Sequence, residues 1–296
     1  MPINSSSDSQ KPRIAIAGAT GRVGSTLIDL LAHDAVDIVA LTRRPEASPL
    51  PPGVITAEVN FDLISTLENA LHGVDRLFIA QGTSPQQVVN EIALIDAAVA
   101  AGVQHVVKLS ALGPATRLIP FAWHMQIEAH LAHQPVASTV LRPSAFSYLF
   151  KRIGAQVATG SWAGAANDGR VNFIDTRDVA EVARVALLED VEAGSQRAFH
   201  LTGPRAWTMY QVAEELSRLL GHSVVYNSHS PAAQRTALLD GGMSSFVADL
   251  LVGLDQVFRD SVLGETTSTV EELTGRPPRP LTQWLADNIT VFQKQA

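Results

Sequence analysis

The chain of 296 residues contains no cysteine, which excludes disulfide bonds, thiolate metal sites and a cysteine nucleophile. A protein without thiols can carry out redox chemistry only with a bound cofactor. The absence of cysteine also fits a reducing compartment, and residues 1–11 are polar and serine-rich, without the apolar core of a signal peptide. We therefore expect a soluble, cytoplasmic protein with a disordered tail over residues 1–11.

Positive charge and long apolar runs are scarce as well. The chain has 22 Lys and Arg against 29 Asp and Glu, a net charge of −7, and no run of basic residues that would attract a phosphate backbone. No stretch approaches the roughly 18 apolar residues of a membrane-spanning helix. We expect a small-molecule substrate and neither nucleic acid nor a membrane as a partner. The oligomeric state is left open, with a homodimer as one option.

Short apolar runs alternate with helical patterns over the first half of the chain. Such an alternation is typical of βαβ units, and it predicts an α/β fold with a Rossmann-type, doubly wound parallel sheet. The expected strands are 13–17, 38–42, 54–60, 76–80, 105–110 and 138–142, and the expected helices are 23–32, 63–71, 86–101 and 123–132. Residues 12–150 are thus predicted to form an NAD(P)-binding Rossmann domain.

The second half, 151–296, is less regular. Residues 154–170 are rich in Gly, Ala and Ser, which indicates a loop or hairpin, and strands are expected at 198–201 and 223–226. Helices are expected at 175–189, 208–220 and 280–288. We expect this segment to return in part to the sheet and otherwise to form a smaller C-terminal α/β lobe that closes over the substrate.

A glycine-rich loop directly follows the first expected strand and opens a helix. Gly18 permits a tight turn, Gly21 lets the backbone approach a pyrophosphate, and Gly24 permits close helix packing. The helix N-terminus offers N–H groups to an anion, and Arg22 can add a charged contact. The alternative is a strand-turn-helix that uses glycine for geometry alone. The predicted dinucleotide loop comprises Gly18, Ala19, Thr20, Gly21, Arg22, Val23 and Gly24.

The end of the second expected strand lacks the acidic residue that binds the ribose 2′-hydroxyl of NAD. Arg43 and Arg44 stand there instead, and guanidinium groups suit a 2′-phosphate. The sequence therefore favours NADP(H) over NAD(H), although both arginines could simply solvate a loop. After the third strand, Asp62 is a candidate for an adenine-side contact or a helix cap. After the fourth, we expect Ala80, Gln81 and Gly82 to pass the adenosine ribose and the pyrophosphate.

Several segments together resemble one protein family. They are GATGRVG (18–24), VVKLSALG (106–113), HMQIE (124–128), VLRPSAF (140–146) and DTRDVA (175–180), with LTGP (201–204) and VEELTGR (270–276) further on. The chain resembles the NmrA-like branch of the atypical short-chain dehydrogenase/reductases over nearly its whole length. That family includes NADPH-dependent reductases of quinones, azo compounds and triphenylmethane dyes, and also NADP(H)-binding sensors without evident turnover.

The resemblance also implies a departure from ordinary short-chain dehydrogenases, whose tyrosine and lysine form a proton-transfer pair. Aligned on Glu128, the equivalent positions are Phe121 and Met125, and neither side chain transfers a proton. Hydride transfer itself needs only the nicotinamide and a well-placed acceptor. Acceptors that are already electrophilic, of the quinone, azo, enone or imine type, suit this deficit.

Three residues are candidates for the catalytic site. His124 is a candidate acid or orienting group; the alternative is a pairing with Glu128, one helical turn away, that only fixes the helix. By the resemblance, Ser110 matches the family's active-site serine and could contact the substrate or the nicotinamide ribose, or merely close a turn. Tyr148 is expected at the substrate mouth or in the core.

Three further assignments complete the predicted site. The resemblance places Pro143 and Phe146 beside the nicotinamide. Lys108, on the fifth strand, is either a ligand contact or a surface lysine. His124, His130 and His133 do not share the spacing of a metal pair, so no metal is expected.

Two functions are consistent with these features. The first is an NADPH-dependent oxidoreductase that transfers hydride to a small conjugated or aromatic acceptor, and the second is an NADP(H)-sensing regulatory protein without turnover. Epimerase or lyase chemistry with a tightly held cofactor is a third.

Overall fold

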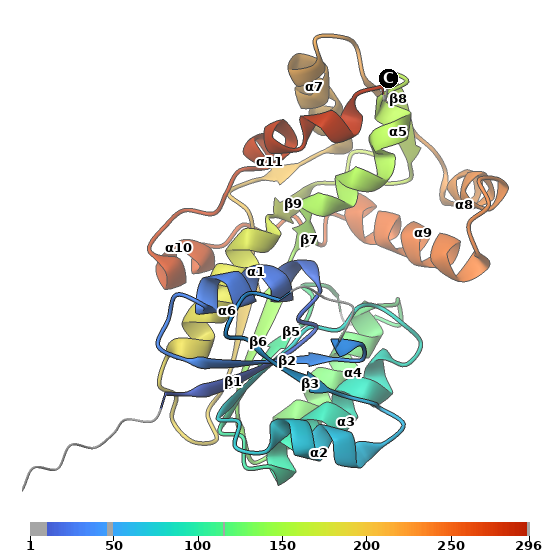
Figure 1. Cartoon of the computed structure of the whole chain (residues 1–296). Coiled ribbons are helices and arrows are strands. Elements are labelled where there is room, and N and C mark those ends of the chain that lie inside the picture. The colour runs from blue at the N-terminus through green and yellow to red at the C-terminus, as the bar shows by residue number, and fades with distance from the viewer. Residues whose placement is uncertain (1–10, 46–49, 115, 295–296) are drawn as a thin grey trace, which may run out of the picture.

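A computed structural model describes residues 11–45, 50–114 and 116–294. Seven parallel strands form its main sheet, in the order β10-β6-β5-β4-β1-β2-β3 (Figure 1). They are β1 (Arg13–Ala17), β2 (Asp37–Thr42), β3 (Ile55–Glu58), β4 (Arg76–Ile79), β5 (His105–Leu109), β6 (Ala137–Pro143) and β10 (Gln196–Leu201). The predicted Rossmann-type doubly wound sheet is confirmed, and six of its strands follow the order 3-2-1-4-5-6 of dinucleotide-binding folds.

Helices cover both faces of this sheet. α1 (Arg22–Leu31) and α6 (Thr176–Leu188) pack on one face, and α2 (Ile64–Leu71), α3 (Gln87–Ala100) and α4 (Phe121–Ala132) on the other. Successive side chains of a strand point to opposite faces. In β1, Ile14 and Ile16 therefore join the core beneath α1 and α6, whereas Ala15 and Ala17 join the core beneath α2 and α3.

The direction of winding reverses between β1 and β4. The chain leaves β1 toward β2 and β3, and it returns through β4 to the other half of the sheet. The connections on the two sides of this point diverge and leave a crevice outside the carboxyl ends of the strands, where such folds bind ligands.

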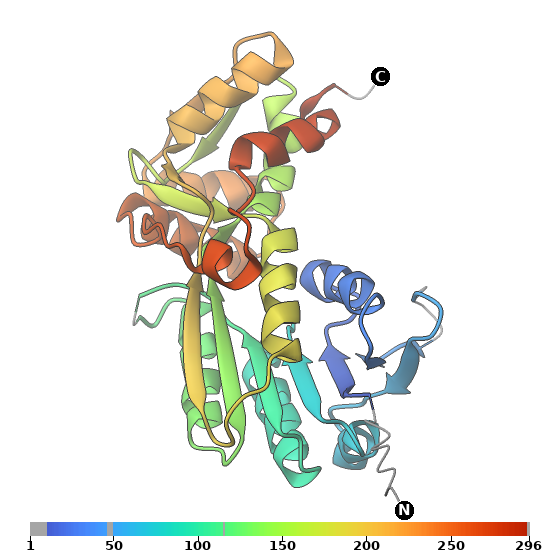
Figure 2. The ribbon, with the colours of Figure 1, turned by 90° about the vertical axis from the view of Figure 1, so that its left-hand side faces the viewer.

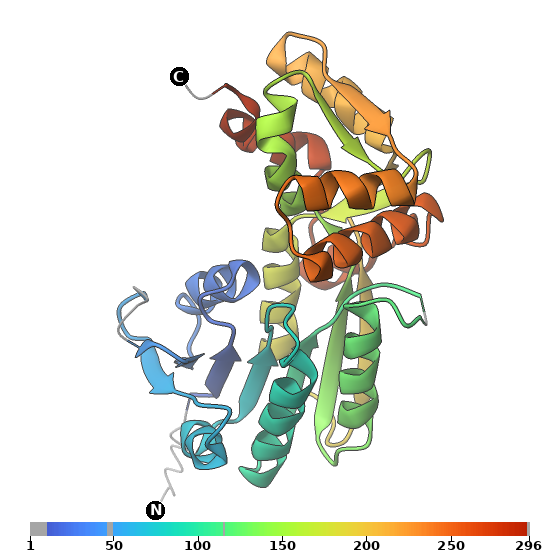
Figure 3. The same cartoon turned by 90° about the vertical axis from the view of Figure 1, so that its right-hand side faces the viewer.

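The rest of the chain lies beyond these carboxyl ends (Figures 1 and 2). It holds a three-stranded sheet of β7 (Ala145–Phe146), β9 (Val171–Ile174) and β11 (Ala206–Trp207), and a parallel pair of β8 (Ser161–Gly164) and β12 (Val225–Ser228). Its helices are η2 (Ser147–Ile153), α5 (Gly154–Val157), α7 (Met209–Leu220), α8 (Pro231–Asp240), α9 (Ser245–Arg259), α10 (Thr269–Thr274), α11 (Leu281–Asp287) and η3 (Ile289–Phe292). Figure 3 shows α8 and α9 on the side of α4.

The structure refines several expected elements. The glycine-rich segment 154–170 is no hairpin: it forms α5 and β8, and β8 pairs in parallel with β12, more than sixty residues later along the chain. β10 joins the main sheet as expected, whereas a domain boundary at residue 150 stays a prediction. Most of the predicted tail, residues 1–10, lies outside the described residues. Among the helices the structure describes, none combines the length and the apolar character needed to cross a bilayer.

Candidate active site

The turn between β1 and α1 depends on two close backbone approaches. Gly18 has a φ of +88°, and a Cβ on it would lie 2.0 Å from the carbonyl oxygen of Ala80, the residue that directly follows β4. A Cβ on Gly24 would lie 2.1 Å from the Gly18 carbonyl oxygen. Any larger residue would force the turn and the helix apart, so glycine is required at both positions.

The first turn of α1 is open toward the crevice. Gly21 is the N-cap residue, with no side-chain cap and no acidic residue in the first turn, and the first helical bond runs from the Ser25 N–H to the Gly21 carbonyl at 2.8 Å. Within the described residues, the N–H groups of Arg22, Val23 and Gly24 have no acceptor. Free N–H groups and the helix dipole favour an anion here.

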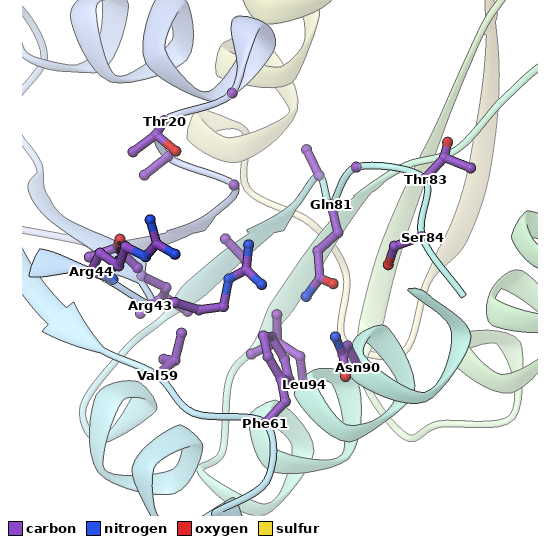
Figure 4. Close-up of a pocket in the computed structure, with 18 residues that line it drawn as sticks. Thr20, Arg43, Arg44, Val59, Phe61, Gln81, Thr83, Ser84, Asn90 and Leu94 are labelled. Carbon is purple, nitrogen blue, oxygen red and sulfur yellow. Dashed lines mark hydrogen bonds between the residues drawn. The ribbon is translucent and has the colours of Figure 1, made fainter. Parts of the chain in front are cut away.

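A cavity of about 680 Å³ extends from this turn across the ends of β2 and β4. Arg43 and Arg44 form one wall and Gln81 stands opposite (Figure 4). Phe61 and Asn90 close the lower side. The cavity thus combines the backbone of the glycine turn, two exposed guanidinium groups and apolar surface, which suits a phosphate group and the adenine of a dinucleotide.

A second cavity, of about 340 Å³, adjoins the first on the side of β5 and β6. The two cavities have six lining residues in common: Gly18, Gly21, Ala80, Gln81, Gly82 and Thr83. His124, Ser110 and Tyr148, the three candidate catalytic residues, all line this second cavity. The glycine loop and residues 80–83 therefore form a shared wall between the cavity that holds the two arginines and the cavity that holds the candidate catalytic residues.

Nearly all the predicted cofactor-binding residues line one of these cavities. Thr20, Arg43 and Arg44 line the first, and Arg22, Val23, Gly24, Ser110, Pro143 and Phe146 line the second. Asp62 lines neither, and it is no helix cap either, because α2 begins after Leu63 without a side-chain cap. Phe61, its neighbour, lines the cavity instead; the sequence signal for it was an aromatic residue directly after the third strand.

Ser110 is held by a charged pair at the edge of the second cavity. Its hydroxyl donates to Glu128, which also receives the guanidinium of Arg142, with Arg142 Nε at 3.2 and 3.1 Å from the two carboxylate oxygens. The Ser110 proton is thereby engaged, so this serine can only accept a hydrogen bond from a ligand. The alternative in which Glu128 pairs with His124 is wrong, because Glu128 binds Arg142.

His124 contacts the fifth strand and not its own helix. Its Nδ1 lies 3.3 Å from Nζ of Lys108, and Lys108 forms an ion pair with Glu91 of α3 at 2.9 Å. Burial, followed by the Lys108 charge, lowers the pKa of His124 to about 2. The imidazole is therefore neutral near pH 7, which leaves the orienting role and argues against an imidazolium acid. Lys108 is neither a surface lysine nor part of a cavity wall, because its side chain is fully buried.

Aromatic and cationic groups stack at the mouth of the second cavity. The rings of Tyr148 and Phe146 are 5.4 Å apart at an angle of 26°, and the Arg22 guanidinium lies over the Tyr148 ring at 4.1 Å. Arg22 comes from the glycine loop, whereas Tyr148 belongs to η2. This contact ties the predicted phosphate loop to the far side of the crevice.

The two positions of the tyrosine-lysine pair have other roles. Phe121 is 6% exposed and packs against Gly113, where a Cβ would lie 2.1 Å from the ring. Met125 is 46% exposed, on the outer face of α4. Neither position offers a titratable group to the cavity.

The DTRDVA segment has a structural role near this site. Asp175 caps α6 by accepting from the Arg177 N–H at 2.9 Å, and Asp178 accepts from the Arg279 N–H at 2.8 Å. The second bond holds Arg279 of the C-terminal segment onto α6, while Thr176 faces the second cavity.

Comparison with known proteins places the chain in a family. The profile of the NmrA-like family matches residues 10–272. An NAD(P)H azoreductase from Xenophilus azovorans is 30% identical over 94% of this chain and 99% of its own length. Quinone oxidoreductase 2 from Escherichia coli strain K12 is 31% identical over 91% and 96%. The crystal structure of the NADPH-dependent quinone oxidoreductase from Escherichia coli in complex with NADPH superimposes with a TM-score of 0.86, at 28% identity over 93% and 99% of the two chains. The chain belongs to the NmrA-like family.

Proposed function

We propose that this protein is an NADPH-dependent reductase that transfers hydride to a small conjugated or aromatic acceptor. The observation that carries the proposal is the pair of adjoining cavities that meet at the open N-terminus of α1. The first holds two arginines, and the second is largely apolar and holds a neutral histidine. A dinucleotide that spans both would place its adenosine end with the 2′-phosphate in the first, its pyrophosphate at the N-terminus of α1 and its nicotinamide in the second.

The residues of the glycine loop and of the first cavity fit NADP(H). The open turn of α1 offers N–H groups to the pyrophosphate, and the two close glycine contacts hold the turn tightly between β4 and α1. Arg43 and Arg44 are positioned for the 2′-phosphate, and the absence of a carboxylate at the end of β2 makes NAD(H) the poorer ligand. When bound, the reduced nicotinamide supplies the hydride.

The second cavity selects the class of acceptor. Its wall is largely aliphatic and aromatic, with few charged groups: Leu109, Ala111, Leu112, Phe121, Phe146, Leu149, Leu250, Leu254 and Leu263 contribute to it. A flat apolar molecule fits such a wall better than a sugar or a charged metabolite does. This favours quinones, azo compounds, enones and imines over nucleotide sugars.

The proton balance of the reaction suits the absence of a tyrosine-lysine pair. Reduction of a quinone to a hydroquinone consumes one hydride, which carries both electrons, and one proton. The proton is added to the oxygen that gains negative charge. His124 is neutral, so in this proposal it donates a hydrogen bond to that oxygen and the proton arrives from water. The names of the azoreductase and quinone oxidoreductase relatives support the same chemistry.

The proposal is tested by measuring NADPH oxidation by absorbance against a panel of quinones, azo dyes, enones and imines, with NADPH binding measured by calorimetry in the same preparation. We expect turnover with at least one acceptor. Tight NADPH binding without turnover across the panel would favour the alternative of an NADP(H)-sensing regulatory protein. The absence of the tyrosine-lysine pair is consistent with that alternative. Loss of NADPH binding altogether would reject both.

We also propose a cytoplasmic location, since a redox protein without cysteine fits a reducing compartment and its cofactor. Cell fractionation with an antibody to the chain tests this. A homodimer stays a prediction, for which sedimentation analysis is the direct measurement.

A further inference from the structure

A buried charged pair lies directly behind the histidine of the second cavity. Glu91 of α3 and Lys108 of β5 are both 0% exposed, and Lys108 Nζ is 2.9 Å from the Glu91 carboxylate. Gln87, one turn earlier on α3, donates to the other Glu91 oxygen at 3.0 Å. Neither charged residue lines either main cavity of the site, so neither is accounted for by ligand contact.

The fold alone gives no reason for this pair. Val106 and Val107, the neighbours of Lys108 on the strand, are fully buried apolar residues. Desolvating an ammonium and a carboxylate is costly, and apolar residues of similar size often serve a core as well or better. A pair kept at such a position points to a task that an apolar side chain cannot perform.

The contacts of Lys108 determine which nitrogen of His124 carries the proton. An ammonium has three donors and no acceptor. Lys108 forms an ion pair with the Glu91 carboxylate, and it directs two of these donors to the Leu109 carbonyl and to Nδ1 of His124, the last at 3.3 Å. Because Lys108 can only donate, Nδ1 of His124 must accept, and the single proton of the neutral imidazole must then be on Nε2.

The Nε2 side of His124 is available to a ligand. Among the described residues, Nε2 has no hydrogen-bond partner, and the imidazole lines the second cavity together with Ser110 and Tyr148. Since the proton of Ser110 is engaged by Glu128, this serine cannot donate to a ligand, whereas Nε2 of His124 can.

We propose that Glu91 and Lys108 are positioning residues that hold His124 in its Nε2–H tautomer, so that it donates a hydrogen bond to the oxygen or nitrogen of the acceptor that gains charge. The tautomer follows from this chain's own contacts, whereas the role toward the acceptor rests on the proposed reductase function. A neutral imidazole of this kind acts as a fixed electrophile and not as a proton source.

The tautomer is tested without substrate or cofactor. Long-range ¹H–¹⁵N spectra of protein labelled with ¹⁵N-histidine distinguish the two neutral tautomers and the imidazolium, and loss of one signal in His124→Gln assigns it. We expect the Nε2–H pattern for His124 in the wild-type protein at pH 7. An Nδ1–H pattern or an imidazolium would overturn the proposal.

A double variant tests the origin of the tautomer. Glu91→Gln/Lys108→Met removes both charges together and so avoids leaving one buried charge unpaired. We expect the Nδ1–H tautomer to become populated, with kcat lowered about tenfold and the affinity for NADPH unchanged. Gln126→Ala, on the exposed face of the same helix, is the matched control and should change neither the spectrum nor kcat.

The two failures are distinguishable. If no acceptor is reduced, the reductase function fails, but the spectra still decide the tautomer. If the double variant does not fold, the wild-type spectrum alone remains decisive. An unchanged Nε2–H pattern in a folded double variant would show that the pair does not set the tautomer.

Discussion

The two cavities of the crevice are built in different ways. The first is formed where β1, β2, β3 and β4 end, and all of its lining residues lie between 17 and 94. The second draws its walls from residues 18–263 and from elements of both halves of the chain. The first is thus a property of the βαβ repeat itself, whereas the second exists only when the C-terminal segment has folded back over the sheet.

This difference separates what the two cavities can specify. The glycine loop and the first cavity recognise the dinucleotide, because helix N–H groups bind negative charge and the two arginines bind a 2′-phosphate. A cavity assembled from distant side chains recognises the variable molecule, the acceptor. Substitutions should accordingly separate into those that abolish cofactor binding and those that leave it intact and change turnover.

The largest effect is expected from closing the wall that the cavities share. Gly21 has a φ of −77°, and a Cβ on it would meet only the Gly18 carbonyl oxygen, at 3.1 Å. Gly21→Leu should therefore keep the fold while its side chain blocks the path of the pyrophosphate, lowering NADPH affinity by more than about a hundredfold in calorimetry. Asp29→Ala, on the exposed side of α1, should leave it unchanged. Unaltered affinity in a folded Gly21→Leu protein would remove the glycine loop from the site.

The arginines of the first cavity should give the next largest effect, and a selective one. Arg43→Ala/Arg44→Ala removes charged hydrogen bonds to the 2′-phosphate, so NADPH affinity should fall about fiftyfold. NADH lacks that phosphate and serves as the internal control, with a change below about threefold. Equal losses for both dinucleotides would mean that the arginines act on the pyrophosphate or on the fold.

The same difference explains how far the sequence alone can lead. The glycine loop and the paired arginines were predicted because β1, α1 and β2 follow one another in the chain. β1 and β2 are also neighbours in the sheet, so residues at their carboxyl ends lie close together. Asp62 does not line the cavity, and its neighbour Phe61 does, because a shift of one residue in an irregular turn changes which side chain faces inward. The limits of prediction here are those of side-chain direction in a turn.

The second cavity was predictable in its members but not in their partners. His124, Ser110 and Tyr148 were candidates from their motifs, yet the motif spacing suggested a His124–Glu128 pair. In the structure, Glu128 pairs with Arg142 of β6, and His124 contacts Lys108 of β5. Which of two strands a helix side chain contacts depends on how the helix is rotated on the sheet, and no local pattern in α4 records that rotation. Its apolar residues surround it too evenly to show a single buried face.

In the second cavity, His124 should affect turnover and spare cofactor binding. His124→Leu removes the hydrogen-bond donor and should lower kcat about tenfold, while NADPH affinity in calorimetry stays within about twofold. His124→Gln keeps an N–H donor of similar reach, so it should retain more of the activity than His124→Leu does. If both variants lose NADPH binding instead, His124 belongs to the cofactor site and the division between the cavities fails at this residue.

The smallest effect is expected from a change of pH, which should leave kcat almost unchanged if His124 stays neutral. Burial and the adjacent Lys108 ammonium, itself paired with Glu91, lower the pKa of His124 to about 2. The imidazole then remains neutral from pH 5.5 to 8, so kcat for a quinone should show no inflection from a histidine across this range. If a protonated His124 were the acid, the rate would be highest at low pH and would fall as the pH rises through its pKa. A decline of this kind, with its midpoint near 6.5 and lost in His124→Gln, would mean that the histidine gives up a proton in the reaction. A flat profile, by contrast, is what a donor that only shares its proton requires, because a group that never changes its charge adds no titration to the rate.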